Sequence, residues 1–252
     1  MAGEGASAPL APHAQPAQGV QAVARALSVL KAFTGAEAFL SLAELGRRTG
    51  MHKPTVLRLA RTLAAEGFLV QRADGAWRLG PSAGAIGACY QAQFDAGVLI
   101  EPLLQELSTT SGESASFHVY EGSIRSCLLR CEGPRGIRYH VRSGELLPLD
   151  RGSAGRVILA ALGEEGDAYD RIRRTGFSIT RGERSPGAAS VSAAVFGAQR
   201  SVLGSVSISG PIDRLTESVL LSCAPAVVQA AARISWALGG VSVAALRSTW
   251  HP

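Results

Sequence analysis

The chain lacks the features of a membrane protein or a secreted protein. No run of ~18 consecutive apolar residues occurs in it, so we expect no membrane span and no membrane partner. Residues 1–18 are rich in Ala, Pro and Gly, and they lack the basic segment that begins a secretory signal. We therefore expect a disordered tail there and a cytoplasmic protein.

The chain has four cysteines, and their arrangement does not predict a metal site. Cys89, Cys127, Cys131 and Cys223 lack the paired short spacings of a zinc ligand set. If residues 123–132 form a strand, Cys127 and Cys131 share one of its faces. We expect reduced, packed thiols, and neither a metal nor another cofactor.

Catalytic motifs are also missing from the chain. It has no G-x-S-x-G nucleophile elbow and no phosphate-binding loop. One enzymatic alternative remains, a Cys/His pair, because His118 and His140 fall on predicted strands and Cys127 and Cys131 are close in sequence. Histidines on strands more often pack than react, so we expect no enzyme. A hydrogen bond between either histidine and a cysteine would favour the alternative.

Residues 41–67 carry the signals of two short helices joined by a tight turn. Ser41 and Glu44 form a capping box, in which the hydroxyl and the carboxylate can each satisfy free backbone N–H groups. The first helix ends at Gly50, which suits the left-handed position after a helix. The second begins near Pro54. Its predicted buried stripe consists of Val56, Leu59, Ala60 and Leu63.

A hairpin follows these helices. Residues 68–72 and 76–79 are two short β-prone runs around Asp74-Gly75, a strong hairpin signal. A helix-turn-helix places its second helix in the major groove of DNA, and a β-wing reaches the flanking backbone. Residues 41–79 therefore predict a winged helix-turn-helix that binds DNA.

Positive charge is concentrated in the same part of the chain. Residues 20–80 carry nine Lys or Arg and four acidic residues, a net +5, whereas the remainder has sixteen of each sign. Because Lys and Arg neutralise DNA phosphates, a basic module beside a neutral one suits a DNA-binding protein. A solvated helix face is the alternative. The coincidence of the charge with the helix and hairpin signals favours DNA binding.

The rest of the chain predicts a second module of helices and antiparallel strands. After a linker helix over residues 81–93, the expected elements are a helix over 99–110, strands over 114–120, 123–131 and 137–141, a helix over 153–162, a hairpin over 189–197 and 201–209, and a last helix over 213–238 with a kink or break at Pro225. This order indicates an α+β fold with one sheet covered by helices.

Five short segments give the chain a resemblance to a known family. They are Arg25–Leu30, Ser41–Leu45, Lys53–Leu59, Trp77–Gly80 and Ser207–Pro211. In their order and spacing, over about residues 20–240, the chain resembles the IclR family of bacterial transcription regulators.

The resemblance implies a domain plan and an assembly. It implies a winged helix-turn-helix over residues 19–80, a linker helix over 81–95, a GAF-like effector-binding domain over 96–240 and a tail over 241–252. It also implies a homodimer or homotetramer on a pseudo-palindromic operator in double-stranded DNA. A small-molecule effector would modulate binding, with repression the more frequent role.

The expected DNA contacts centre on the second helix of the helix-turn-helix. Thr55 and Arg58 lie three residues apart on its exposed side. Arg can fork onto guanine, and Thr can meet a thymine methyl group or a phosphate. Lys53 and Ser41 lie at helix starts, where free backbone N–H groups favour phosphates. Arg72 and Arg78 flank the wing, and they either contact DNA or are simply solvated. The full expected set is Arg25, Ser41, Lys53, Thr55, Arg58, Arg61, Arg72 and Arg78.

The expected effector contacts lie in the second module. Ser205, Ser207 and Ser209 alternate with apolar residues, so their hydroxyls share one face of a strand, which is either solvent-exposed or a pocket wall. From the resemblance, the expected effector-binding residues are Ser153, Ala154, Arg181, Ser190, Ser207 and Ser209.

The chain also departs from the family pattern. It is shorter between Glu164 and Arg171, and Thr180 or Arg181 stands where the family carries an acid that touches the effector. An arginine beside a serine face suits a small anionic effector, an organic or aromatic acid. The alternative function is a GAF-like small-molecule sensor that has weak or lost DNA binding and acts through protein contacts.

Overall fold

The fold is described from a computed structural model over residues 20–33, 37–92, 96–135 and 143–239. The expected tails, the expected strand 137–141 and His140 lie outside these residues. The chain divides into two compact units, residues 1–86 and 87–252, and each is described by itself.

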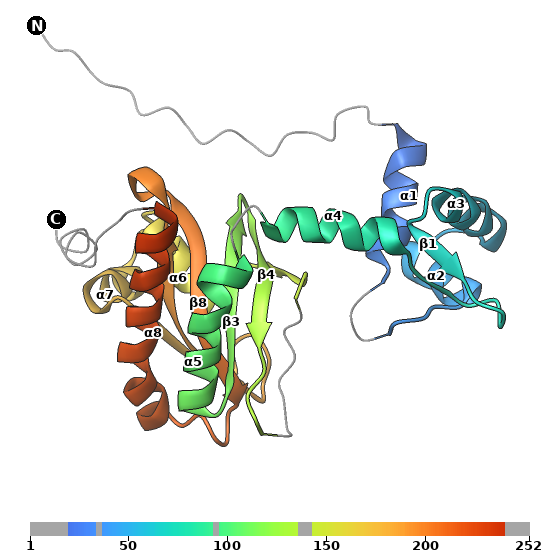
Figure 1. Cartoon of the computed structure of the whole chain (residues 1–252). Coiled ribbons are helices and arrows are strands. Elements are labelled where there is room, and N and C mark those ends of the chain that lie inside the picture. Colours follow the sequence, from blue (N-terminus) through green and yellow to red (C-terminus); the bar gives the residue numbers. More distant parts are fainter. Residues whose placement is uncertain (1–19, 34–36, 93–95, 136–142, 240–252) are drawn as a thin grey trace, which may run out of the picture. The chain divides into compact units, whose positions relative to one another are not determined.

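The N-terminal unit combines helices with a two-stranded antiparallel sheet (Figure 1). In chain order its described elements are α1 (Gln21–Lys31), α2 (Leu42–Thr49), α3 (Lys53–Ala65), β1 (Leu69–Gln71) and β2 (Trp77–Leu79). Val29, Leu45, Val56 and Trp77 belong to one core shared by all three helices and the sheet. The predicted helix-turn-helix and hairpin are both present.

The start of α2 forms only half of the predicted capping box. Ser41 Oγ accepts a hydrogen bond from the backbone N–H of Glu44 at 3.2 Å, and Gly50 ends the helix at a φ of +67°. The Glu44 carboxylate does not bind back to the helix start. It accepts hydrogen bonds from Arg47 and Arg48 instead, because guanidinium groups bind a carboxylate more strongly than one backbone N–H does.

The wing is held by its turn and by one tryptophan. Gly75 adopts a φ of +81°, and Asp74 Oδ1 accepts from the backbone N–H of Ala76 at 3.0 Å. Trp77 is 1% exposed, and its backbone pairs with Leu40 in both directions, at 2.8 and 2.9 Å. Trp77 therefore packs inside this unit and holds the wing against it.

The C-terminal unit is a six-stranded antiparallel sheet covered by helices, and the predicted α+β class is confirmed. Helix α4 (Pro81–Ala92) spans the boundary between the two units. The following elements are a π-helical turn (Ala96–Ile100), α5 (Glu101–Ser111), β3 (Ser114–Glu121), β4 (Ile124–Cys131), β5 (Leu146–Pro148), α6 (Ser153–Ala161), α7 (Asp167–Thr175), β6 (Ser178–Arg181), β7 (Ala188–Phe196), a 3₁₀ turn (Ala198–Arg200), β8 (Val202–Pro211) and α8 (Glu217–Gly239). The strand order is β5-β4-β3-β8-β7-β6.

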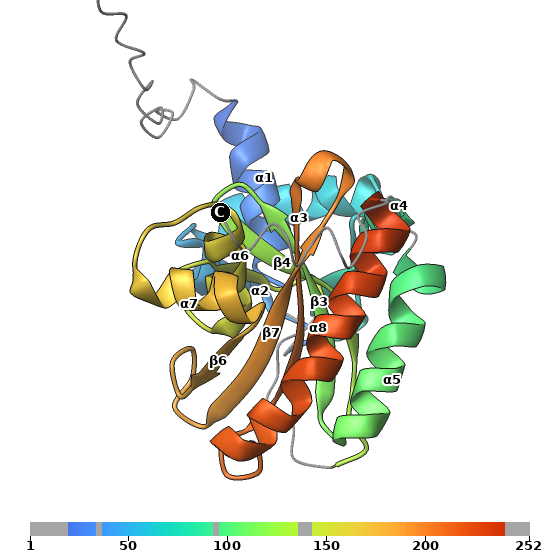
Figure 2. The same cartoon turned by 90° about the vertical axis from the view of Figure 1, so that its left-hand side faces the viewer.

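One face of this sheet is apolar and carries α5 and α8, which lie side by side (Figure 1 and Figure 2). The core between them includes Phe117, Val191, Val206 and Ile208 from the strands, and Leu104, Leu107, Leu220 and Val227 from the helices. Among the described helices, α8 alone is long and apolar enough to span a membrane, with a mean hydropathy of 1.3. Its Leu220, Val227 and Ile234 are fully buried, so core packing accounts for that composition.

The opposite face of the sheet is lined by hydroxyl groups and covered by α6. Strand register aligns two rows of side chains across four strands: Ser116, Ser207, Ser192 and Ser178 in one, and Ser114, Ser209, Ser190 and Thr180 in the other. Val157 and Ala160 of α6 pack against Ala194 on this face. Ser205 and Ser207 are 0% and 2% exposed, so the solvent-facing alternative for the β8 serines is wrong.

A β-bulge changes the expected positions of two cysteines. Phe117 lies opposite Leu129, but the next residue, His118, lies opposite Cys127, so β4 has one extra residue there. Cys127 therefore shares a face with His118, whereas Cys131 lies in the apolar core under α5. The expectation that both cysteines share a face is wrong, because the bulge reverses the alternation of side chains.

Four further elements differ from the expectations. The short edge strands β5 and β6 were not predicted, and α7 occupies the segment where the chain is shorter than its family. Helix α8 runs through Pro225 as one element, so of the expected kink or break the break is absent. The β7–β8 hairpin matches its prediction closely.

Candidate functional site

The first candidate site is the exposed face of α3. Lys53, Arg58 and Arg61 are exposed and Thr55 is half-buried, whereas the opposite face of the helix is buried in the core. Lys53 is the first helical residue, and the helix start has no side-chain cap. Pro54 has no N–H, and the N–H groups of Thr55 and Val56 bind the His52 carbonyl, so only the Lys53 N–H has no partner among the described residues. This N–H and the positive dipole end of the helix add to the charge that α3 presents to an anion.

The remaining expected DNA-binding residues lie around this helix, and all are exposed. Arg25 is on α1, and Ser41 caps α2. In the wing, the Arg72 guanidinium lies 4.3 Å from the centre of the Phe39 ring and 3.4 Å from Asp74 Oδ2. These contacts limit the directions in which Arg72 can extend.

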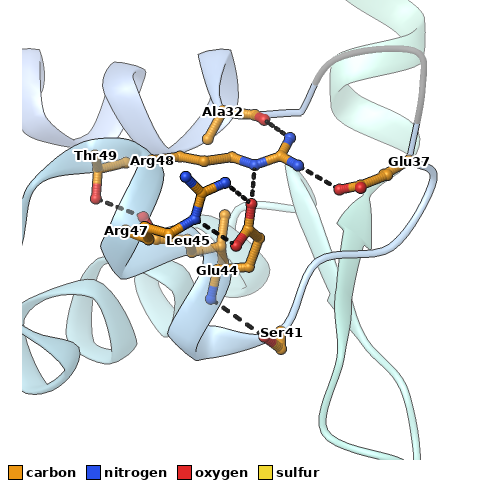
Figure 3. Close-up of polar contacts among 8 residues, drawn as sticks. All are labelled: Ala32, Glu37, Ser41, Glu44, Leu45, Arg47, Arg48 and Thr49. Carbon is orange, nitrogen blue, oxygen red and sulfur yellow. Dashed lines mark hydrogen bonds and ion pairs between the residues drawn. The ribbon is translucent and has the colours of Figure 1, made fainter.

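Two other arginines of this unit are engaged within the protein (Figure 3). Arg47 donates to both Glu44 oxygens, at 2.6 and 2.9 Å, and Arg48 Nε donates to Glu44 at 2.6 Å. Arg48 also pairs with Glu37 and donates to the carbonyl of Ala32 at 3.0 Å. This cluster joins α2 to the end of α1, so part of the positive charge counted in the sequence has a structural role.

The cluster predicts a pH effect on stability. The guanidinium groups of Arg47 and Arg48 lower the pKa of Glu44 from 4.5 to about 2. A carboxylate with a lowered pKa stabilises the fold above its unfolded pKa, and that contribution is lost as pH falls through the folded value. We expect the wild type to lose more stability between about pH 4.5 and pH 2 than Glu44→Gln does, in thermal unfolding followed by circular dichroism.

Glu66→Gln is the matched control for that experiment. Glu66 is exposed at the end of α3, and its side chain has no ion pair with a described residue. The Glu66 variant should keep the wild-type pH profile. Parallel profiles for wild type and Glu44→Gln would contradict the role given to the cluster.

The second candidate site is a cavity between the hydroxyl face of the sheet and the start of α6. It opens to solvent and has a volume of about 30 Å³. Its polar lining consists of Ser116, His118, Arg125, Ser153, Thr180, Arg184, Ser190, Ser207 and Ser209, with the backbone of Gly152 and Ala154. The fold therefore brings polar residues from β3, β4, α6, β6, β7 and β8 together around one cavity.

A chain of hydroxyl groups fixes one wall of the cavity. Ser153 Oγ lies 2.7 Å from Ser190 Oγ and 2.6 Å from Ser192 Oγ, and Ser192 Oγ lies 2.7 Å from Ser207 Oγ. Thr180 Oγ1 accepts from the Ser153 backbone N–H at 2.9 Å. The start of α6 is thus fastened to three strands.

Other polar atoms of the lining have no partner among the described residues. They are Ser116 Oγ, Ser209 Oγ, His118 Nδ1 and Arg125 Nε, all buried. Buried polar groups in proteins are almost always hydrogen-bonded, so several orphans around one cavity indicate a site for a polar ligand or ordered water.

The cavity is electropositive. Burial, followed by the charge of Arg184, lowers the pKa of Arg125 to about 10, at which it stays protonated at neutral pH. Burial and the same arginines lower the pKa of His118 to about 3, so its ring is neutral. The charge at this site therefore comes from the two arginines, and it favours an anion.

Five of the six expected effector residues line this cavity, namely Ser153, Ala154, Ser190, Ser207 and Ser209. Arg181 does not. It is exposed and donates to the backbone carbonyl of Ile212 at 3.3 Å, because Thr180 faces the cavity and the next residue of β6 points away. Its neighbour Arg184 lines the cavity, as do Ser116, His118 and Arg125, which sequence reasoning missed.

Among the described residues, nothing supports the Cys/His alternative. The Cys127 thiol donates to the carbonyl of Leu129 at 3.6 Å, and His118 Nδ1 has no partner among the described residues. Burial raises the pKa of Cys127 to about 12, so it is a thiol at neutral pH and not a nucleophile.

Both units of the chain match models of known protein families. The model of the IclR helix-turn-helix domain matches residues 22–73, and the model of the bacterial transcriptional regulator IclR C-terminal domain matches residues 92–169 and 166–236. The chain belongs to the IclR family. It is a DNA-binding transcriptional regulator and not an enzyme.

Individual proteins that are similar to this IclR-family regulator over most of its length support the family assignment. The transcriptional repressor IclR of Escherichia coli is 26% identical, over 90% of this chain and 93% of its own. An IclR-family regulator of Brucella abortus has a solved structure with 26% identity, a TM-score of 0.66 and coverage of 91% and 97%. An IclR homologue from Microbacterium hydrocarbonoxydans, solved with 4-hydroxybenzoate, shares the fold at 18% identity, a TM-score of 0.71 and coverage of 85% and 97%.

Proposed function

We propose that this regulator is a cytoplasmic repressor that binds a pseudo-palindromic operator as a dimer or tetramer. A small anionic molecule in the α6 cavity modulates that binding. The observation that carries the effector part is the cavity itself, with its two arginines and its orphan hydroxyl groups. Repression is supported by the curated relative from Escherichia coli, which is named a repressor.

In this proposal α3 reads the operator. Arg58 and Thr55 contact bases in the major groove, and Lys53 and Arg61 contact phosphates beside them. Arg25, Ser41, Arg72 and Arg78 make the outer backbone contacts. Arg47 and Arg48 are left out of the reading surface because Glu44 and Glu37 already hold them.

The effector acts through the arrangement of subunits. Two recognition helices of a dimer must lie about one DNA turn, ~34 Å, apart to read two half-sites. A ligand that binds one subunit arrangement more tightly than another changes the populations of the two, and the operator affinity changes with them. The 4-hydroxybenzoate bound to the Microbacterium homologue supports a small-molecule effector for this fold.

The first test is fluorescence anisotropy of the full chain with the intergenic DNA beside its own gene. The titration is done at roughly 50 and 200 mM salt, with unrelated DNA as competitor. We expect tight binding that weakens with salt and resists the competitor. Binding that the competitor abolishes, for this DNA and for a genome-wide selected set of fragments, would refute the operator-binding part and favour the sensor alternative.

A further inference from the structure

Arg125 is an unusual feature of the cavity because its charge is buried and no described carboxylate forms an ion pair with it, although Asp150 and Glu145 are near enough to raise its pKa. The residue is 2% exposed and makes no ion pair with a described carboxylate. Its Nη1 donates to the carbonyl of Pro148 and its Nη2 to that of Arg151, at 3.1 Å, but its Nε has no partner. Burying a charge without an opposite charge destabilises a fold, so an anion that pairs with Arg125 would be strongly favoured.

A second cation that has no ion pair with a described carboxylate lines the same cavity. Arg184 lines the cavity and is half-buried. Its neighbour Glu183 does not neutralise it, because that carboxylate pairs with Arg156 and accepts from the backbone N–H of Gly152 at 3.2 Å. The two arginines are close: a side chain at Gly152 would place its Cβ 3.6 Å from both Arg125 Nη2 and Arg184 Cβ.

The first turn of α6 adds two free donors. The N–H groups of Gly152 and Ser153 are bound by Glu183 and Thr180, whereas those of Ala154 and Gly155 have no partner among the described residues. A Cβ at Gly155 would lie 2.8 Å from Arg125 Nη1, so this turn and the guanidinium are adjacent. Together they can bind one carboxylate through charged and backbone donors.

These donors define the ligand. The cavity volume of about 30 Å³ holds roughly two water-sized groups, the size of a carboxylate's two oxygens. We propose that the effector is a small dicarboxylate, with one carboxylate buried against Arg125 and the first turn of α6, and the other at the mouth against Arg184. This assignment rests on the proposed effector function of the cavity.

A purely structural role for Arg125 is the competing explanation. Its two carbonyl contacts fasten the segment between β5 and α6, and a variant could fail for that reason alone. Arg184 has no such contact with a described residue. The decisive variant is therefore Arg184→Gln, and Arg125→Lys is the supporting one.

The experiment is isothermal titration of the full chain with malonate and succinate, each compared with its own half-amide and with inorganic phosphate. We expect the diacid to bind at least about tenfold more tightly than its half-amide, the effect of one charge-assisted hydrogen bond. Arg184→Gln should reduce that ratio to about one. Arg125→Lys should weaken diacid and half-amide equally, because the buried carboxylate is common to both.

Arg174→Gln is the matched control. It removes the same charge from an exposed position of α7 and should leave every affinity unchanged. Half-amides that bind as tightly as the diacids, phosphate that binds more tightly than both, or no binding by any of these probes would each overturn the dicarboxylate assignment.

The operator titration separates this inference from the proposed function. If a neutral molecule or a monocarboxylate releases the operator and the diacids do not bind, the regulator proposal stands and the dicarboxylate assignment falls. If the diacids bind with the expected ratio but leave operator affinity unchanged, the assignment stands and the effector role falls.

Discussion

Arg58→Ala is expected to weaken specific operator binding by about 1–3 kcal/mol, roughly 5- to 150-fold, and to relax base preference at one position of each half-site. The reason is geometric. Arg58 is exposed on α3, and among the described residues its guanidinium has no partner that would hold it back. Fluorescence anisotropy with the operator and with single-base variants of it measures both effects.

Two comparisons make the Arg58 result specific. Arg72→Ala should weaken all sequences similarly and reduce the slope of log affinity against log salt by about one, as loss of a phosphate contact does. Arg174→Ala, on exposed α7, should change neither quantity. Unchanged operator affinity in Arg58→Ala would show that α3 is not the recognition helix.

Gly155→Ala is expected to destabilise the C-terminal unit by about 1–3 kcal/mol, although it adds a single methyl group to a helix. The added Cβ would lie 2.0 Å from the carbonyl oxygen of Leu149, which is a backbone atom and cannot rotate away. Helix α6 would have to lift from the sheet, and the cavity wall would move with it. Urea unfolding followed by circular dichroism measures the loss.

Gly87→Ala is the control for that substitution. Gly87 lies within helix α4, and nothing described lies within 4 Å of a Cβ added there. Because Ala has a higher helix propensity than Gly, this variant should be neutral or more stable by up to ~1 kcal/mol. Equal unfolding free energies for Gly155→Ala and wild type would mean that α6 does not pack against the Leu149 carbonyl as described.

The parts of the fold that the sequence predicted correctly depend on local signals. The cap at Ser41, the glycine at Gly50 and the Asp74-Gly75 turn each act within a few residues, so the helix-turn-helix and wing follow from them directly. The β7–β8 hairpin is also local. The short edge strands β5 and β6 have too few residues for an alternating pattern, and their pairing with neighbouring strands decides them.

The candidate site was only partly predictable, because its geometry is non-local. Ser207 and Ser209 stand out by their alternation, but Ser116 becomes a cavity residue only through its register with Ser207. Nothing in the local sequence marks Arg125 as a buried residue, and it is β5 and α6 that bury it. Thr180 and Arg181 are adjacent in β6, so their side chains point to opposite faces of the sheet and only one of them can line the cavity. A strand of four residues is too short for its sequence to show which of the two faces inward.

Part of the positive charge of residues 20–80 is engaged within the protein and is not free to contact DNA. Arg47 and Arg48 contribute to the positive charge of residues 20–80, but Glu44 and Glu37 bind them. The sequence contains the i, i+3 and i, i+4 spacings of the Glu44 pairs. It does not reveal that Glu37, eleven residues away from Arg48, completes the cluster.

The two faces of the C-terminal sheet have separate consequences for how such a regulator can evolve. The side under α5 and α8 carries the apolar core, where most substitutions are costly. The hydroxyl side under α6 contributes less apolar burial, so under the proposed function an exchange of a serine or of Arg184 there would alter ligand choice while leaving the fold's main source of stability intact. A lineage with this sheet can acquire a new inducer through a few replacements on one side, and retain the same DNA-reading unit.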